Sequence, residues 1–254
     1  MTIAGSDPSG GAGLQADLKT FHQHGVYGTS IVTLLTVQNT QSVSAVQRID
    51  VDFVRAQLDA VISDLPPTAA KTGALGSAAI IDAIAERAAE FVFPLVVDPV
   101  MISKHGVCLI DDDAVSTLRN QLIPRAFLLT PNRLEAARLA DQKVETIDQM
   151  MTAASAIFAM GARNVLVKGG GLQKQAVDVL YDGSRFSLFE AERIETVHTH
   201  GTGCVLSAAI TANLAKGLTL NDAIESAKRF ISMAIERGSG VGKGIGPVDF
   251  HSPI

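Results

Sequence analysis

Two kinds of hydrophobic pattern alternate along most of the chain. Short, continuous apolar runs predict buried strands, and these runs occupy residues 2–4, 30–37, 70–72, 95–98, 127–130 and 165–168. The stretches between them carry an apolar residue every three or four positions, as a helix with one buried face requires. One such face carries Val54, Leu58, Val61 and Leu65, and another carries Ala114, Leu118 and Leu122. This alternation predicts an α/β fold with a mainly parallel central sheet and helices on both faces.

The pattern changes in the C-terminal third of the chain. Residues 176–194 are typical of a small β-hairpin, with Asp182-Gly183 as its turn. Two helical stretches follow, each ended by a glycine: 204–216 before Gly217 and 220–237 before Gly238. Because no internal repeat, low-complexity tract or linker interrupts the chain, we expect a single domain over residues 1–254.

Composition narrows the class of protein. The chain has 254 residues, 47% of them hydrophobic and 22 of them glycine, which suits one compact enzyme-like domain. A net charge of −5 argues against a nucleic-acid-binding protein. No apolar run approaches the roughly 18 residues of a membrane span, and residues 1–5 predict a strand and a turn rather than a signal peptide. Two cysteines are too few for a disulfide framework, so we expect a cytoplasmic protein that does not bind membranes.

The most informative segment is Thr199-His200-Gly201-Thr202-Gly203-Cys204, which leads directly into an apolar helical stretch. A glycine-rich turn at a helix start exposes backbone N–H groups and the positive end of the helix dipole, so it predicts an anion site. The thiol of Cys204 on the first helical turn is expected to ionise more easily than a free cysteine. An anion site beside a potential base indicates phosphoryl transfer.

Polar side chains also follow several of the predicted strands. The amide of Gln38 suits either an aminopyrimidine edge, which offers an amino group beside a ring nitrogen, or the backbone of its own loop. Asn132 and Glu135 share one face of a helix, where their oxygens suit Mg²⁺ or its waters; a helix cap is the alternative role for Asn132. Lys168 is followed by Gly169-Gly170, a combination that approaches phosphates closely.

The N-terminal glycine-rich segment has two interpretations. Gly11-x-Gly13-x-x-Ala16 matches the spacing of a dinucleotide-binding turn, but the next strand ends in Gln38-Asn39-Thr40 and lacks the acidic residue that should hold the ribose. We therefore favour a loop that closes over a small substrate, with Asp17 either directed at that substrate or simply solvated. The P-loop motif, the protein-kinase motifs and a zinc-ligand cluster are absent from the sequence.

Together these segments resemble the ribokinase-like small-molecule kinases, and among them the hydroxymethylpyrimidine/phosphomethylpyrimidine kinases of thiamine biosynthesis. The resemblance runs over nearly the whole chain. It is carried by residues 2–13 (TIAGSDPSGGAG), 15–21 (QADLKTF), 37–40 (VQNT), 71–73 (KTG), 98–101 (DPVM), 130–132 (TPN) with 134–135 (LE), 168–170 (KGG), 199–204 (THGTGC) and 242–248 (GKGIGPV). So many matches in order are more specific than any single motif.

The resemblance implies a ribokinase-like fold and a reaction that uses ATP and Mg²⁺. The small-molecule substrate would be 4-amino-5-hydroxymethyl-2-methylpyrimidine, and a second transfer to its monophosphate would give the pyrophosphate. Family members hold the ring with residues that match Gln38, Asp17, Gly5 and Val100.

The resemblance also implies roles in catalysis and nucleotide binding. Gly201, Thr202 and Gly203 would form the anion hole, with Cys204 as the base. Asn132, Glu135 and Lys168 would serve ATP, the first two also Mg²⁺, and Lys243 would close near the nucleotide. Because relatives are commonly dimers, a homodimer is a further expectation.

Two other functions remain open at this point. A pyridoxal-type kinase of the same fold would differ mainly in its ring pocket, where Gln38 favours the aminopyrimidine. A non-catalytic pyrimidine-binding protein would have no need of Cys204 or of the Asn132/Glu135 pair.

Overall fold

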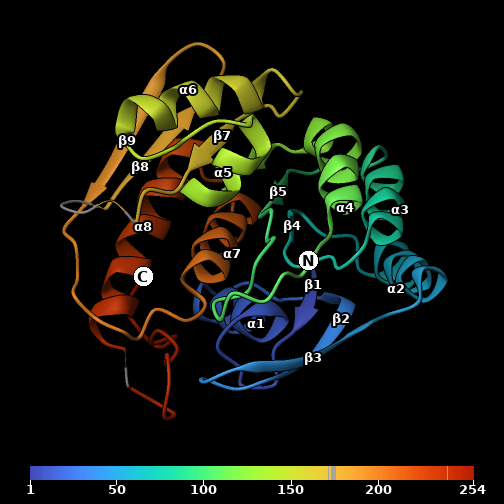
Figure 1. The fold of residues 1–254 in the computed structure, drawn as a ribbon. Coiled ribbons are helices and arrows are strands. Elements are labelled where there is room, and N and C mark those ends of the chain that lie inside the picture. Colours follow the sequence, from blue (N-terminus) through green and yellow to red (C-terminus); the bar gives the residue numbers. More distant parts are fainter. Residues whose placement is uncertain (171, 173–175, 239) are drawn as a thin grey trace.

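The computed structural model describes residues 1–170, 172, 176–238 and 240–254. Their strands form one sheet in the order β3-β2-β1-β4-β5-β6-β7-β8-β9 (Figure 1). These strands are β1 (Thr2–Ser6), β2 (Ser30–Gln38), β3 (Val43–Arg48), β4 (Ala70–Thr72), β5 (Leu95–Val97), β6 (Leu128–Leu129), β7 (Val165–Val167), β8 (Ala176–Tyr181) and β9 (Phe186–Ala191). Neighbours from β2 through β1 to β7 run parallel, whereas the pairs β2–β3, β7–β8 and β8–β9 are antiparallel. The predicted mainly parallel α/β sheet is confirmed.

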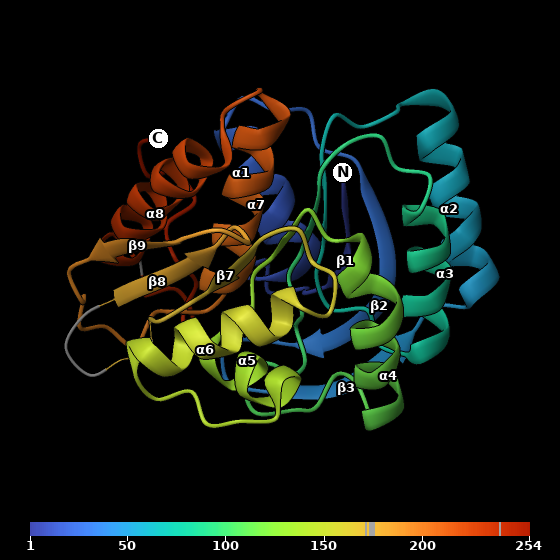
Figure 2. The ribbon, with the colours of Figure 1, turned by 90° about the horizontal axis from the view of Figure 1, so that it is seen from above.

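Helices cover both faces of this sheet (Figure 2). They are α1 (Gly13–Gln23), α2 (Val51–Asp64), α3 (Ala78–Ala88), α4 (Asp112–Thr117), α5 (Arg133–Ala140), α6 (Ile147–Phe158), α7 (Thr202–Ala215) and α8 (Leu220–Glu236). Val96, Leu128 and Leu166 belong to the core shared with α7 and α8. Their neighbours Val97, Leu129 and Val167 belong to the core under α2, α3 and α6. Successive strand residues point to opposite faces, so strands buried on both sides appear as continuous apolar runs.

The structure departs from the sequence predictions at two elements. The edge strand β3 was not predicted, because five of its six residues are exposed and it lacks the alternation that a half-buried strand shows. The helix predicted from Ala114, Leu118 and Leu122 is α-helical only to Thr117. It continues as a π turn and then a 3-10 turn that contains Pro124, which has no N–H to donate to a further helical turn. All three predicted apolar side chains are nevertheless buried.

The predicted hairpin is present as β8 and β9. The carboxylate of Asp182 accepts hydrogen bonds from the amides of Ser184 (2.8 Å) and Arg185 (2.9 Å), which fixes the turn. Among the described helices, none is long and apolar enough to cross a membrane.

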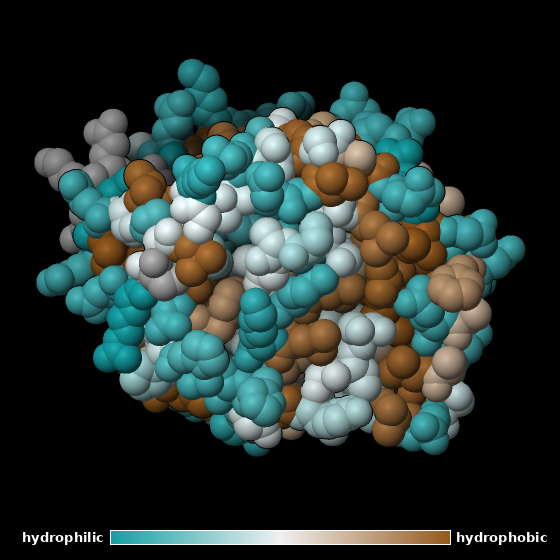
Figure 3. All heavy atoms as spheres, turned by 90° about the horizontal axis from the view of Figure 1, so that it is seen from below, coloured by the Kyte–Doolittle hydropathy of each residue, from teal (hydrophilic) through white to brown (hydrophobic). Residues whose placement is uncertain are grey.

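The β2–β3 pair carries exposed apolar side chains, with Leu35 and Val37 on one face and Val46 on the other. Figure 3 looks onto the side of the molecule where these strands lie and shows apolar surface between hydrophilic patches. The homodimer expected from the family resemblance stays a prediction.

Candidate active site

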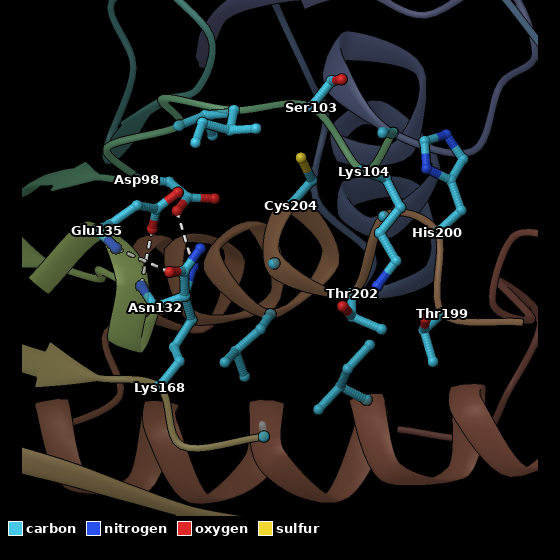
Figure 4. A pocket seen from close by; sticks show the side chains of 18 of the residues that line it. Asp98, Ser103, Lys104, Asn132, Glu135, Lys168, Thr199, His200, Thr202 and Cys204 are labelled. Atoms are coloured by element: carbon cyan, nitrogen blue, oxygen red, sulfur yellow. Dashed lines mark hydrogen bonds and ion pairs between the residues drawn. The ribbon is translucent and has the colours of Figure 1, made fainter. Parts of the chain in front are cut away.

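A cavity of about 750 Å³ opens at the carboxyl ends of the parallel strands, where open α/β sheets bind ligands. Its volume lies within the usual range for small-molecule sites. Most of the predicted site residues line it: Gly5, Gln38, Val100, Asn132, Glu135, Lys168, Gly201, Thr202, Gly203 and Cys204. Figure 4 shows Asp98, Glu135, Asn132 and Lys168 on one side of the cavity, Lys104, His200, Thr199 and Thr202 on the other, and Cys204 between them.

The turn before α7 has the geometry of the predicted anion site. Gly201 is the N-cap of α7 and has φ 84°, a backbone conformation that favours glycine. A Cβ on Gly201 would lie 1.8 Å from the carbonyl oxygen of Gly11, so the turn packs directly against the N-terminal glycine-rich loop. The amides of the first turn of α7 have no partner within the helix and lie at the positive end of its dipole. Gly201 therefore brings the two loops together at the wall of the cavity.

The thiol of Cys204 is less acidic than predicted. Burial raises the pKa of Cys204 to about 11, although the positive charge of Lys71 acts in the opposite direction. The expectation that the helix start would make this thiol ionise more easily than a free cysteine is therefore wrong, because burial outweighs the favourable charges. The resting group at neutral pH is the thiol.

Asp17 does not lie where a contact with the substrate would require it. Its carboxylate is fully buried, accepts a hydrogen bond from Thr2 Oγ1 (2.6 Å) and forms a 2.6 Å ion pair with the equally buried Lys71. The spacing of α1 already pointed this way, because Asp17 falls on the apolar face that carries Leu14 and Phe21. Asp17 thus holds Lys71 in the core, and the positive charge of Lys71 in turn acts to lower the pKa of Cys204.

We expect the Lys71→Met variant to lose about 3–5 kcal/mol of unfolding free energy, because it leaves the Asp17 carboxylate buried without its partner. The double variant Lys71→Met/Asp17→Leu should recover most of this loss, since neither charge then remains in the core. Urea unfolding of the two variants and the wild type measures both effects. A double variant as unstable as the single one would contradict the charge-pair explanation.

Lys168 joins the anion turn to a buried carboxylate. Its Nζ donates to Asp98 Oδ1 at 2.8 Å, and Ser207 Oγ on α7 donates to Asp98 Oδ2 at 3.2 Å. A Cβ on Gly203 would lie 3.3 Å from Lys168 Nζ, so the ammonium group stands beside the turn. These surroundings are consistent with the expected position of Lys168 near phosphates, whereas its pairing with Asp98 was not predicted from the sequence.

Asn132 and Glu135 form a capping box at the start of α5. The side-chain oxygen of Asn132 accepts from the amides of Leu134 and Glu135, both at 2.9 Å, and Glu135 Oε2 accepts from the amide of Asn132 at 2.7 Å. Both lone pairs of the Asn132 oxygen are therefore in use. Of the two roles considered for Asn132, the structure supports the helix cap, and the expected metal-ligand role is better filled by a carboxylate.

Glu135 and Asp98 carry the carboxylates that suit the role of metal ligand, and Figure 4 shows them side by side. Burial raises the pKa of Glu135 to about 7, with the negative charge of Asp98 adding to the shift and Lys168 opposing it. Among the described residues, no cluster of three or more His, Cys, Asp or Glu side chains has the geometry to hold a metal ion.

The opposite side of the cavity contains a network that the sequence did not predict. His200 Nε2 lies 2.8 Å from Asp7 Oδ2 and 3.2 Å from Gln38 Nε2. Burial alone would raise the pKa of Asp7, but hydrogen bonds from His200 and Ser9 outweigh burial and hold the pKa below its ordinary value. An ionised Asp7 thus fixes His200, which contacts the amide of Gln38. Its position next to the anion turn was the only signal for His200 in the sequence.

Lys243 lies away from the cavity wall. It is exposed, and its loop is held by hydrogen bonds from the amides of Gly244 (3.2 Å) and Ile245 (2.8 Å) to Thr40 Oγ1 and O. A role for Lys243 near the nucleotide stays a prediction.

Residues 7–249 match the model of a protein family described as phosphomethylpyrimidine kinase. The chain belongs to this family. It is 45% identical to the hydroxymethylpyrimidine/phosphomethylpyrimidine kinase of Escherichia coli over 258 residues, which cover 99% of this chain and 97% of the relative. It is 48% identical to the thiamine biosynthesis bifunctional protein ThiED of Geobacter sulfurreducens. That match covers 98% of this chain but spans only about half (51%) of the bifunctional protein.

Solved structures show the same fold. The pyridoxal kinase of Staphylococcus aureus in complex with AMP-PCP and pyridoxal superposes with a TM-score of 0.91 at 36% identity, over 99% of this chain and 92% of that one. The ribokinase-like fold implied by the sequence is thereby confirmed. The dinucleotide-binding alternative for the N-terminal loop has no support, since family and fold neighbours are kinases.

Proposed function

We propose that this enzyme transfers a phosphoryl group from ATP to 4-amino-5-hydroxymethyl-2-methylpyrimidine and then to the resulting monophosphate. One observation carries the proposal: Gln38, the anion turn and Cys204 line a single cavity in a member of the phosphomethylpyrimidine kinase family. The E. coli relative, named for both phosphorylations, matches this chain over nearly its whole length. The non-catalytic alternative is disfavoured, because the cavity keeps the thiol, the anion turn and Lys168 together.

One side of the cavity binds the pyrimidine ring, and the anion turn with Lys168 binds the transferred phosphoryl group. Gln38, which contacts His200, accepts a hydrogen bond from the amino group of the pyrimidine through its carbonyl oxygen and donates one to the ring nitrogen through its N–H. The amides of Thr202, Gly203 and Cys204 stabilise negative charge on the migrating phosphoryl group, and Lys168 adds a positive charge beside them. The thiolate form of Cys204 takes the proton of the substrate hydroxyl as the bond to phosphorus forms.

The residues on the phosphate side also fit Mg²⁺. Mg²⁺ in kinases is commonly held by one or two carboxylates together with substrate phosphates and water. Asp98 and Glu135 supply such a pair, and Glu135 must be ionised to bind the cation. The ion would neutralise charge on the phosphates of ATP.

Mass spectrometry of the product formed from hydroxymethylpyrimidine, ATP and Mg²⁺ tests the proposal directly. We expect the monophosphate first and the pyrophosphate after longer reaction. A substrate that remains unchanged, while ADP forms from another acceptor, would contradict the proposal.

Pyridoxal is the main rival substrate, since the Staphylococcus aureus neighbour is a pyridoxal kinase with bound pyridoxal. Gln38 separates the two, because an aminopyrimidine presents a donor beside an acceptor and pyridoxal does not. We expect faster ADP release with hydroxymethylpyrimidine than with pyridoxal. The Gln38→Leu variant should lose about 10- to 100-fold in kcat/KM for the pyrimidine, since ring groups then stay unpaired.

The same variant should change kcat/KM for pyridoxal much less, so the ratio of the two substrates is the decisive quantity. Gln47→Leu, at an exposed position of the edge strand β3, is a suitable control for the loss of one glutamine. Equal losses with both substrates would contradict the role of Gln38 in choosing the ring.

A further inference from the structure

Lys104 stands at the tip of a short loop between β5 and α4. The loop is closed by a bridge between Ile102 and Cys108, and Ser103 fixes its turn: the Ser103 amide donates to Val107 O (2.8 Å) and Ser103 Oγ accepts from the Val107 amide (3.0 Å). Lys104 lines the cavity, and Figure 4 shows its side chain directed toward Thr202 in the anion turn. The loop thus carries an ammonium group to the substrate side of the turn.

Packing of the next residue holds this loop in place. The ring of His105 lies 6.2 Å from the ring of His200, centroid to centroid. His200 directly precedes Gly201 and contacts Gln38. It therefore links the loop of Lys104 to the anion turn and to Gln38, the residue proposed to bind the pyrimidine ring. Lys104 is therefore on the side of the cavity proposed to hold the pyrimidine, opposite Asp98 and Glu135 (Figure 4).

The charge of Lys104 is not neutralised within the described part of the protein. Two other lysines of the cavity have carboxylate partners: Lys168 pairs with Asp98 at 2.8 Å and Lys228 with Asp178 at 2.6 Å. Among the described residues, no ion pair involves Lys104. Its positive charge remains available to an anionic ligand in the cavity.

The second phosphorylation needs such a charge and the first does not. In the second transfer, an oxygen of the monophosphate forms a bond to the γ-phosphorus of ATP. The bond from that phosphorus to the β,γ-bridging oxygen breaks, and ADP leaves with the electron pair. No proton has to be removed, because the second pKa of a phosphate monoester is about 6 and the acceptor is a dianion at neutral pH. The negatively charged monophosphate must instead approach the negatively charged γ-phosphate of ATP, and the two repel each other. In the first transfer the acceptor is a neutral alcohol, so this repulsion is absent.

We propose that Lys104 binds the phosphate of the monophosphorylated pyrimidine and is the residue that allows the second phosphorylation. The proposal deepens the function proposed above and rests on it. It makes Lys104 specific for the second acceptor, whereas Lys168 and the anion turn serve the transferred group in both steps.

The Lys104→Met variant tests this assignment when kcat/KM is measured separately with hydroxymethylpyrimidine and with its monophosphate. We expect kcat/KM for the monophosphate to fall about 10- to 100-fold, the usual effect of losing a hydrogen bond to a charged group. The fall with the alcohol should be several times smaller, and Lys104→Arg should restore most of the activity. Lys143→Met removes an exposed lysine that does not line the cavity and is the matched control.

Equal losses with both acceptors would overturn the proposal, and so would the same selective loss in Lys143→Met. Calorimetric titration of the monophosphate, without nucleotide, provides a readout that does not depend on turnover. Weaker binding to Lys104→Met than to the wild type supports the phosphate contact, and equal binding overturns it. If the wild-type protein binds the monophosphate but phosphorylates neither acceptor, the proposed function fails while the binding comparison still decides the role of Lys104.

Discussion

Replacing Cys204 by alanine should lower turnover with hydroxymethylpyrimidine by about 10²-fold or more, while the affinity for the pyrimidine stays close to that of the wild type. The thiol touches the reacting end of the cavity and not the ring site at Gln38, so its removal takes away a proton acceptor without a binding contact. The backbone amide at position 204 remains, and the anion site is preserved. Single-turnover rates and equilibrium binding of the substrate measure the two effects separately.

The two acceptors provide an internal control for this variant. Because the monophosphate acceptor is already deprotonated at neutral pH, Cys204→Ala should slow its phosphorylation far less than that of the alcohol. Alcohol phosphorylation by the wild type should also rise as the pH increases from 7 toward 10, since the pKa of Cys204 is about 11 and the thiolate fraction grows over this range. A variant with wild-type turnover on the alcohol would reduce Cys204 to a packing role.

Replacing Gly201 by alanine should reduce turnover with both acceptors by about 10²-fold, because a Cβ at this position meets the carbonyl oxygen of Gly11 at 1.8 Å. Either the anion turn or the N-terminal loop must then move, and a displacement near 1 Å in a catalytic site costs about this much. The φ of 84° adds strain for any residue with a side chain, so unfolding free energy should fall by about 2 kcal/mol or more.

Gly217→Ala is the matched control for this variant. Gly217 has φ 85°, almost the same as Gly201, but nothing lies within 4 Å of a Cβ built there. It should therefore lose only the 1–2 kcal/mol of left-handed strain, with turnover near that of the wild type. If both variants lost stability and activity equally, backbone strain rather than close packing of the two loops would explain the effect of Gly201→Ala.

The sheet and most helices followed from periodicity, because central strands buried on both faces and helices with one buried face leave plain patterns. The sequence left no such pattern for β3, whose residues face solvent, or for the π turn after Thr117, where the buried stripe continues although the helix geometry changes. Local patterns report burial more directly than they report backbone geometry.

The site was predictable in its location and less so in the roles of single residues. The ends of the strands and the anion turn converge on one cavity, as parallel topology requires. Asp17 was assigned to the substrate because its partner Lys71 is distant in the sequence, although its place on the apolar face of α1 already indicated burial. For Asn132, the helix cap was one of the two expected roles, and only the structure distinguishes between them. Burial of Cys204 is likewise a tertiary property, and it reversed the expected direction of the pKa shift.

The roles of Cys204 as base and of residues 202–204 as anion site are best tested by a crystal structure with hydroxymethylpyrimidine and a non-hydrolysable ATP analogue. We expect the substrate hydroxyl within hydrogen-bonding distance of Cys204 Sγ, and the terminal phosphate of the analogue on the amides of residues 202–204. A ring bound with its CH₂OH group turned away from this sulfur, toward another strand end, would rule out Cys204 as the base.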